Sequence, residues 1–242
     1  MMKKYGVLAA MFVLACGVMP VGVQAYTMTV VDFDQGEIVE VIDNGVQKSA
    51  STGEFTVTVE DNSGQLLTSE NGDEWFAAFC VEIGQPISIP DLVPDVDLLT
   101  PGTFAGGLQA AWLMENRHQF TPAGLLGVEN SGLQLALWEV TKDSQNQPDL
   151  NGGVFRTMES INSVDGAKKA VQLAGLYLES LALHFNPAGL DDLYRIVHHS
   201  DKQDLLIKLG DPGTSAAVPE PGTFLLIAGG LLGIGAIVRR RS

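Results

Sequence analysis

The sequence is poor in cysteine and in basic residues. Only two of its 242 residues are cysteine, Cys16 and Cys80, and 14 Lys and Arg stand against 29 Asp and Glu, which gives a formal net charge of −15. A framework of several disulfides, which stabilises many small secreted domains, is therefore excluded. Binding to a phosphate backbone needs clustered Lys and Arg, so we expect no nucleic-acid partner.

The motifs of common metal sites and hydrolases are also missing. There is no HExxH, no D-x-[DN]-x-[DN]-G calcium loop and no GxSxG. His198 and His199 end a strand-like run, where adjacent side chains point to opposite faces and do not readily share a metal. We expect that the protein binds no metal and no cofactor and that it is not an enzyme. A cysteine hydrolase with a triad of Cys80, His118 and an acidic residue is one alternative function, but the spacing of these residues does not support it.

Residues 1–25 are typical of a secretory signal peptide. Two lysines precede an apolar run that ends in the small-residue sequence Val23-Gln24-Ala25, and cleavage is predicted after Ala25. The alternative is a lipoprotein site in "VLAC" at 13–16, which would leave Cys16 lipidated as the new N-terminus. With the first interpretation, Cys80 is the only cysteine of the exported chain.

Residues 218–242 have three parts. Val218-Pro219-Glu220-Pro221 opens the segment, an uncharged stretch of 17 residues at 222–238 follows, and Arg239, Arg240 and Arg241 come directly after it. The uncharged stretch is at the short end of what spans a bilayer, and the arginines are expected on the cytoplasmic side. The sequence predicts a transmembrane helix at 222–238 with the body of the protein facing outward.

This tail resembles the PEP-CTERM sorting signal of Gram-negative surface proteins. The partner of that signal is exosortase, a membrane protease and transpeptidase. The resemblance implies a temporary inner-membrane anchor that is cut near the Pro-Glu-Pro motif, and a body that is then handed to the cell surface or extracellular matrix.

Between the two ends lies an exported domain, predicted at 26–209, with a linker at 210–217. Leaving out 1–25 and 218–242 removes five basic residues and one acidic residue, so the exported part has a net charge near −19. Period-two patterns and turn residues predict strands, and longer periodic segments predict helices. The result is an α+β fold, an antiparallel β framework with an inserted helical block. The expected strands are 26–33, 37–43, 54–60, 75–83, 191–199 and 204–209, the expected helices are 103–117, 131–143 and 164–185, and 86–102 is expected to be a crossover.

Cys80 lies within the predicted strand 75–83. Alternation places it with Glu82 on one face. The opposite face is bulky and is expected to be core: Trp75, Ala77, Phe79, Val81 and Ile83. A buried free cysteine is often a small hydrophobe, and an unpaired exported cysteine can also form an intermolecular disulfide. Both explanations stay open.

Gln134 is a second unusual residue, because its primary amide stands among apolar residues in "GLQLALW". A buried amide must find hydrogen-bond partners or it destabilises the fold. One explanation is a capping box, in which Ser131 begins the helix and Gln134 reaches back to the backbone N–H of the cap.

Taken together, "FCV" at 79–81 and "LQLALW" at 133–138 resemble the paired motifs of bacterial surface thioester domains. The resemblance covers about residues 75–185 and implies a fold in which the Cys80 sulfur and the Gln134 side-chain carbonyl form an internal thioester with loss of ammonia. Such a bond captures an amine of a partner once, without turnover. Trp138 lies one turn beyond Gln134 on the same helix face, where it would either cover the bond or only pack the helix onto the sheet. Glu82, on the same strand face as Cys80, is a candidate proton acceptor.

Two features depart from that family. The tail is an exosortase signal and not a wall anchor, and Leu133 stands where the family has a threonine-like residue. The sequence thus predicts an exported surface or matrix protein with covalent capture through Cys80 and Gln134. The alternative is a non-covalent structural matrix protein with the same fold and an unreactive buried Cys80.

Overall fold

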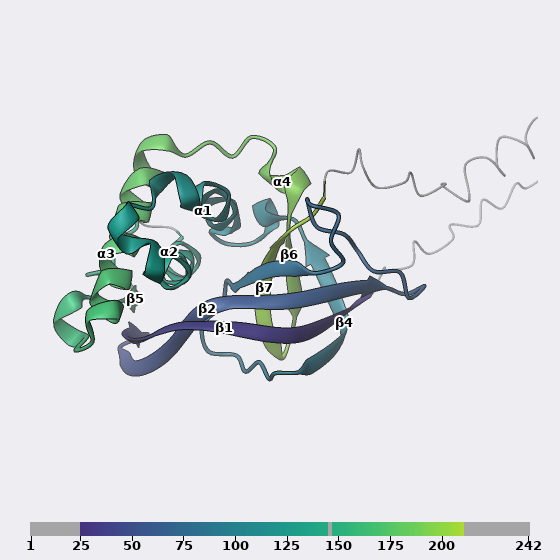
Figure 1. The fold of residues 1–242 in the computed structure, drawn as a ribbon, viewed down its shortest axis with the longest axis horizontal. Coiled ribbons are helices and arrows are strands. Elements are labelled where there is room, and N and C mark those ends of the chain that lie inside the picture. The colour runs from purple at the N-terminus through teal and green to yellow at the C-terminus, as the bar shows by residue number, and fades with distance from the viewer. Residues whose placement is uncertain (1–24, 145–146, 211–242) are drawn as a thin grey trace, which may run out of the picture.

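A closed antiparallel barrel and a group of helices make up the part of the chain that the computed structural model describes, residues 25–144 and 147–210 (Figure 1). The α+β class is confirmed, because three long helices lie in sequence between strands of one antiparallel sheet. The predicted signal peptide, apart from Ala25, and the predicted sorting signal lie outside the described residues.

Six strands close the barrel. They run in the order β2-β3-β7-β6-β4-β1, and β1 pairs again with β2. β4 pairs with the N-terminal end of β1, and β5 pairs with its C-terminal end, at Ile42 and Asp43. Every pairing is antiparallel. The strands are β1 (Tyr26–Asp43), β2 (Val46–Asp61), β3 (Phe76–Cys80), β4 (Asp91–Leu99), β5 (Phe155–Arg156), β6 (Tyr194–His199) and β7 (Lys202–Lys208).

The first strand is longer than predicted. The segments 26–33 and 37–43 were expected as two strands, but they form the single strand β1, which pairs with β2 along most of its length. A register shift between Gln35 and Ile38 marks a bulge at Gly36. There the backbone comes so close to helix α2 (Glu129–Lys142) that a Cβ on Gly36 would lie 2.3 Å from the Ser131 Oγ.

The crossover predicted at 86–102 contains a strand, β4, which pairs with β1 and β6. Pro94 made this segment read as irregular, because proline cannot donate to a ladder. In the structure the neighbouring Asp95 adopts a φ of 58°, and the pairing with β1 shifts register nearby, between Tyr26 and Met28. The local irregularity accommodates the proline.

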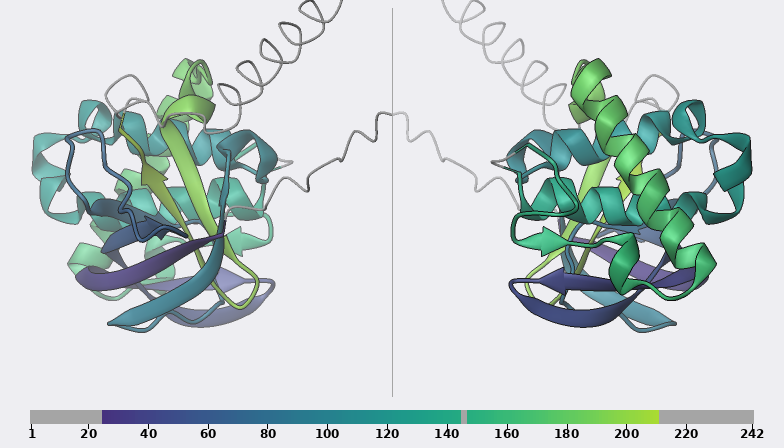
Figure 2. Two further views of the ribbon diagram at one scale, coloured as in Figure 1. Left: turned by 90° about the vertical axis from the view of Figure 1, so that its right-hand side faces the viewer. Right: turned by 90° about the vertical axis from the view of Figure 1, so that its left-hand side faces the viewer.

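The helices gather on one side of the barrel (Figure 2). Helix α2 packs against α1, α3, β2 and β3, and its residues from Ser131 to Val140 are all buried. It is therefore the central helix of the domain. The helices are α1 (Gly107–Phe120), α2 (Glu129–Lys142), α3 (Asp165–His184) and the short α4 (Leu190–Leu193), with 3-10 turns at Pro101–Thr103, Ala123–Val128 and Glu159–Ile161.

The predicted single core face of the strand at 75–83 is wrong. Strand β3 covers only Phe76–Cys80, Trp75 is 50 % exposed, and Phe76 and Cys80 are buried. Both faces are covered because β3 is a strand of the closed barrel and helix packing covers it from outside the barrel. On the face of Phe79, the Arg117 guanidinium of α1 lies 5.1 Å from the ring centroid.

Candidate functional site

Gln134 and Cys80 are joined by two hydrogen bonds. The backbone N–H of Cys80 donates to the Gln134 Oε1 at 3.1 Å, and the Gln134 Nε2 donates to the backbone carbonyl of Cys80 at 2.6 Å. Both residues are buried. The structure thus brings together the two residues that the motifs pair, although they are 54 positions apart in sequence.

The capping-box explanation for Gln134 is wrong. Helix α2 begins at Glu129, two residues before Ser131, and its N-cap residue Val128 makes no side-chain cap. The side chain of Gln134 is directed to β3 and does not bond back to its own helix.

The position of Cys80 explains why its backbone needs a side-chain partner. Pairing of β3 with β2 ends at Ala78, whereas pairing with β7 continues to Cys80. The N–H of Val81 donates to Asp204 of the β7 side, so the alternation of an antiparallel ladder turns the N–H and C=O of Cys80 toward β2. No backbone of β2 pairs there. The primary amide of Gln134 supplies the one donor and one acceptor that are missing.

Ser131 positions the helix that carries Gln134. Its Oγ accepts a hydrogen bond from the backbone N–H of Glu37 at 2.9 Å, beside the bulge at Gly36. The carbonyl of Glu37 accepts a hydrogen bond from the Thr52 hydroxyl at 2.6 Å. The first turn of α2 is thus attached to the β1–β2 ribbon, and Gln134 follows one turn later above β3. The sequence indicated Ser131 only as a cap, and its contact with a distant bulge left no local signal.

Cys80 is a free, buried cysteine. Burial raises the pKa of its thiol well above the usual range. A thiol that stays protonated at neutral pH is a weak nucleophile toward outside reagents. Burial also keeps the sulfur away from a second chain, so the intermolecular disulfide is disfavoured.

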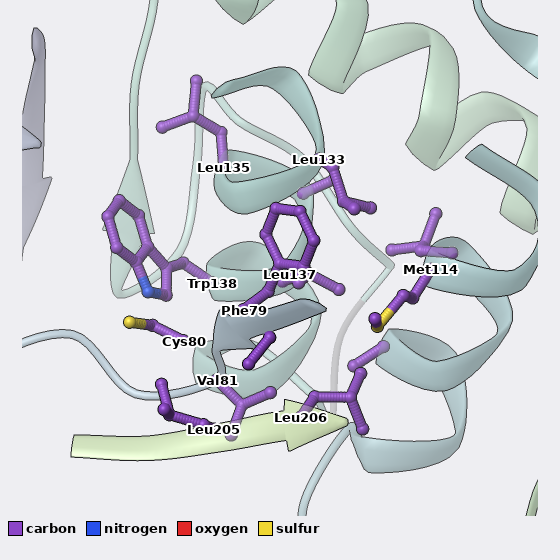
Figure 3. Close-up of a cluster of buried hydrophobic side chains, with 14 of the residues drawn as sticks. Phe79, Cys80, Val81, Met114, Leu133, Leu135, Leu137, Trp138, Leu205 and Leu206 are labelled. Atoms are coloured by element: carbon purple, nitrogen blue, oxygen red, sulfur yellow. The ribbon is translucent and has the colours of Figure 1, made fainter. Parts of the chain in front are cut away.

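Trp138 lies one turn after Gln134 on α2. Its indole packs edge-on against Phe155, with ring centroids 6.1 Å apart, and both rings are buried. Figure 3 shows the Cys80 side chain pointing toward the indole. Trp138 therefore occupies the place where a cover over the Cys80 sulfur would lie.

Glu82 shows no comparable link. Its backbone carbonyl accepts a hydrogen bond from Gln203. Among the described residues, its carboxylate makes no hydrogen bond or ion pair with Cys80, Gln134 or any other side chain. A role for Glu82 in proton transfer stays a prediction without a supporting contact.

Glu139 is a buried acid that sequence reasoning missed. One carboxylate oxygen accepts a hydrogen bond from the Asp149 N–H at 2.7 Å, and the other has no partner within the described ranges. Burial, with a smaller contribution from the negative Asp143, raises the pKa of Glu139 to about 7. Asp143 in turn accepts hydrogen bonds from the N–H groups of Val154 and Phe155. These two acids hold the 149–155 segment, and with it Phe155, against α2.

The histidines take part in local pairs. His118 is exposed, with its Nδ1 2.7 Å from a Glu129 oxygen, and the His198 Nδ1 lies 2.9 Å from the Asp204 carboxylate. Over residues 25–144 and 147–210, no three His, Cys, Asp or Glu side chains form a group that could hold a metal ion.

Comparison with known families concerns the C-terminus. Residues 217–241 match the family model described as the PEP-CTERM protein-sorting motif. The chain carries a PEP-CTERM sorting signal. This signal indicates secretion and processing by exosortase in the envelope of a Gram-negative cell. The predicted transmembrane helix at 222–238 lies outside the described residues, and no helix within them is long and apolar enough to cross a membrane.

No curated protein matches the chain. Among solved structures, it is similar to the N-terminal thioester domain of the fibronectin-binding protein SfbI from Streptococcus pyogenes. The two are 14% identical with a TM-score of 0.39, and the match covers 80% of this chain and 97% of that domain.

Proposed function

We propose that the exported domain captures an amine-bearing partner at the cell surface or in the matrix through an internal thioester between Cys80 and Gln134. The observation that carries this proposal is the pair of hydrogen bonds between the Gln134 amide and the Cys80 backbone. They hold the amide at the residue that bears the thiol, and proximity of this kind favours an otherwise slow acyl transfer.

The same hydrogen bonds suit the charge changes of the reaction. When the Cys80 sulfur adds to the Gln134 carbonyl carbon, negative charge develops on Oε1. That oxygen already accepts a hydrogen bond from the backbone N–H of Cys80 at 3.1 Å, so this N–H would stabilise the oxyanion. The C–N bond then breaks, the thiol proton leaves with the nitrogen, and one ammonia is released.

Capture reverses the exchange with a new nitrogen. A primary amine attacks the thioester carbonyl, the C–S bond breaks, and a C–N bond forms to Gln134. A proton of the amine ends on the sulfur of Cys80. The product amide keeps one N–H, which can again donate to the Cys80 carbonyl. The event happens once per molecule, so the protein acts as an adhesin and not as an enzyme.

A labelling experiment tests this proposal. The exported form of the chain is incubated with a biotinylated primary amine, beside Cys80→Ala and Gln134→Ala variants. We expect label on wild type only, attached to the peptide that contains Gln134, together with one new free thiol. Absence of label from wild type would contradict covalent capture.

The second candidate is a structural matrix protein that does not react. It is favoured by the fact that the Gln134 amide already has a complete role in the fold, as a replacement for the missing β2 partner of Cys80. In that case wild type and both variants take up equally little amine, and Cys80 is only a small buried side chain.

A further inference from the structure

Trp138 carries a buried donor without an acceptor. Its side chain is 2 % exposed, and its Nε1 has no hydrogen-bond partner in the part of the chain that the structure describes. Leaving a buried N–H unpaired destabilises a fold. Buried polar groups in native proteins are nearly all paired, so an unpaired one needs a physical explanation, of which a catalytic role is one.

The position of this donor suggests the function. Trp138 follows Gln134 by four residues, so the two side chains lie on the same face of α2, and Gln134 is bonded to the backbone of Cys80. In Figure 3 the indole nitrogen is on the edge of the ring toward which the Cys80 sulfur points. Phe155 packs against the ring at 6.1 Å and is itself attached to Asp143 through its N–H. The indole is therefore held in place.

The sulfur of Cys80 becomes a good acceptor only during the reaction. A neutral thiol or thioester sulfur accepts hydrogen bonds weakly. When an amine expels the sulfur from the thioester, the electron pair of the breaking C–S bond stays on the sulfur. Negative charge in such buried surroundings is costly unless a donor is present.

We propose that the Trp138 indole N–H donates a hydrogen bond to the Cys80 sulfur as the amine expels it, which makes Trp138 a catalytic residue of capture. The inference rests on the proposed thioester. The indole keeps its own proton throughout, and the proton that finally neutralises the sulfur comes from the attacking amine. Trp138 would thus do more than exclude water from the bond.

Trp138→Phe tests the donor, because it removes the N–H and keeps an aromatic ring. Trp112→Phe is the matched control, since Trp112 is also buried in a helix and stacks on Phe120. Two quantities are measured: the fraction of molecules that lack one ammonia, and the rate at which methylamine releases the Cys80 thiol. We expect Trp138→Phe to form the thioester and to release the thiol at about one tenth of the wild-type rate or slower. Trp112→Phe should match wild type in both.

Each other outcome has one meaning. Wild type without a thioester overturns both the proposed function and this inference. A thioester that methylamine cleaves equally fast in wild type and Trp138→Phe overturns the inference alone.

A second measurement tests the hydrogen bond if the Trp138→Phe variant does not fold or does not form the thioester. The indole N–H resonance of wild type is assigned with Trp75→Phe and Trp112→Phe and followed after methylamine capture. A downfield movement of the Trp138 resonance that titrates together with the Cys80 thiolate supports the hydrogen bond. A resonance that does not respond overturns it.

Discussion

The side-chain amide of Gln134 pairs with the backbone of Cys80 at the point where β2 and β3 separate. A helix side chain thus completes the edge of a barrel strand. This relationship couples the position of α2 to the strand that bears the thiol.

Gln134→Ala should destabilise the fold even when no thioester is present. The substitution leaves the N–H and C=O of Cys80 without partners in a buried place, at a cost of about 1–3 kcal/mol for each group. Chemical unfolding of the Cys80→Ala protein with and without Gln134→Ala measures the loss. Gln172→Ala, on the exposed side of α3, is the control and should change the free energy of unfolding little. Equal effects of the two glutamine substitutions would show that the amide does not hold α2 to β3.

Ser131→Ala should lower both stability and thioester yield. The backbone N–H of Glu37 loses its acceptor, which costs about 1–2 kcal/mol, and the first turn of α2 is freed from the bulge at Gly36. Unfolding and the fraction of molecules lacking ammonia are measured on the same preparation. Ser180→Ala in α3 serves as the comparison. If Ser131→Ala lowers stability and leaves the yield unchanged, Ser131 supports the fold without positioning Gln134.

Glu139 should make stability fall as pH rises. Its ordinary pKa is 4.5 and its pKa in the folded protein is about 7. Between these values the folded state holds a proton that the unfolded state has lost, so the free energy of unfolding decreases with pH, by about 3 kcal/mol in all. Glu139→Gln keeps the acceptor for the Asp149 N–H and should remove this decrease. Unfolding of both proteins from pH 4 to pH 8 checks it, with Glu179→Gln as an exposed control. A stability difference between wild type and Glu139→Gln that is constant over this range would contradict the account.

Two helical glycines should respond in opposite ways to alanine. A Cβ on Gly132 of α2 would lie 2.8–3.0 Å from side-chain atoms of Leu173, whereas a Cβ on Gly175 of α3 meets no atom within 4 Å. Gly132→Ala should therefore cost about 1–3 kcal/mol through overpacking. Gly175→Ala should gain up to about 1 kcal/mol from helix propensity. Thermal unfolding compares the two. Similar changes in the two variants would mean that the α2–α3 contact is not tightly packed at Gly132.

The sequence predicted the helices well because their periodic segments are long, and it predicted the α+β class from the change of period along the chain. It missed β4, because a proline such as Pro94 is unusual inside a strand. The irregular pairing with β1 that accommodates this proline cannot be predicted from the segment itself. The sequence also placed the core of the strand at 75–83 on one face, because alternation cannot show that helices cover the other.

The site was predicted as the pair Cys80 and Gln134, with supporting roles for Trp138 and Glu82. Motif resemblance indicated Cys80 and Gln134, but the reason for their meeting depends on where β2 leaves β3, which no local pattern records. Ser131 and Glu139 were missed as positioning residues for a similar reason. Each acts through a partner that is distant in sequence or through burial that single residues do not reveal.

The intact mass of the exported protein tests the central claim most directly. The chain is purified without reductant beside Cys80→Ala, which is processed in the same way and gives the reference mass. We predict that wild type is one ammonia lighter than the mass calculated from the Cys80→Ala protein plus the difference between cysteine and alanine. We also predict that methylamine converts this form to a methylamide with one free thiol. A wild-type mass that retains the ammonia, with a Cys80 thiol detectable on unfolding, would contradict the thioester.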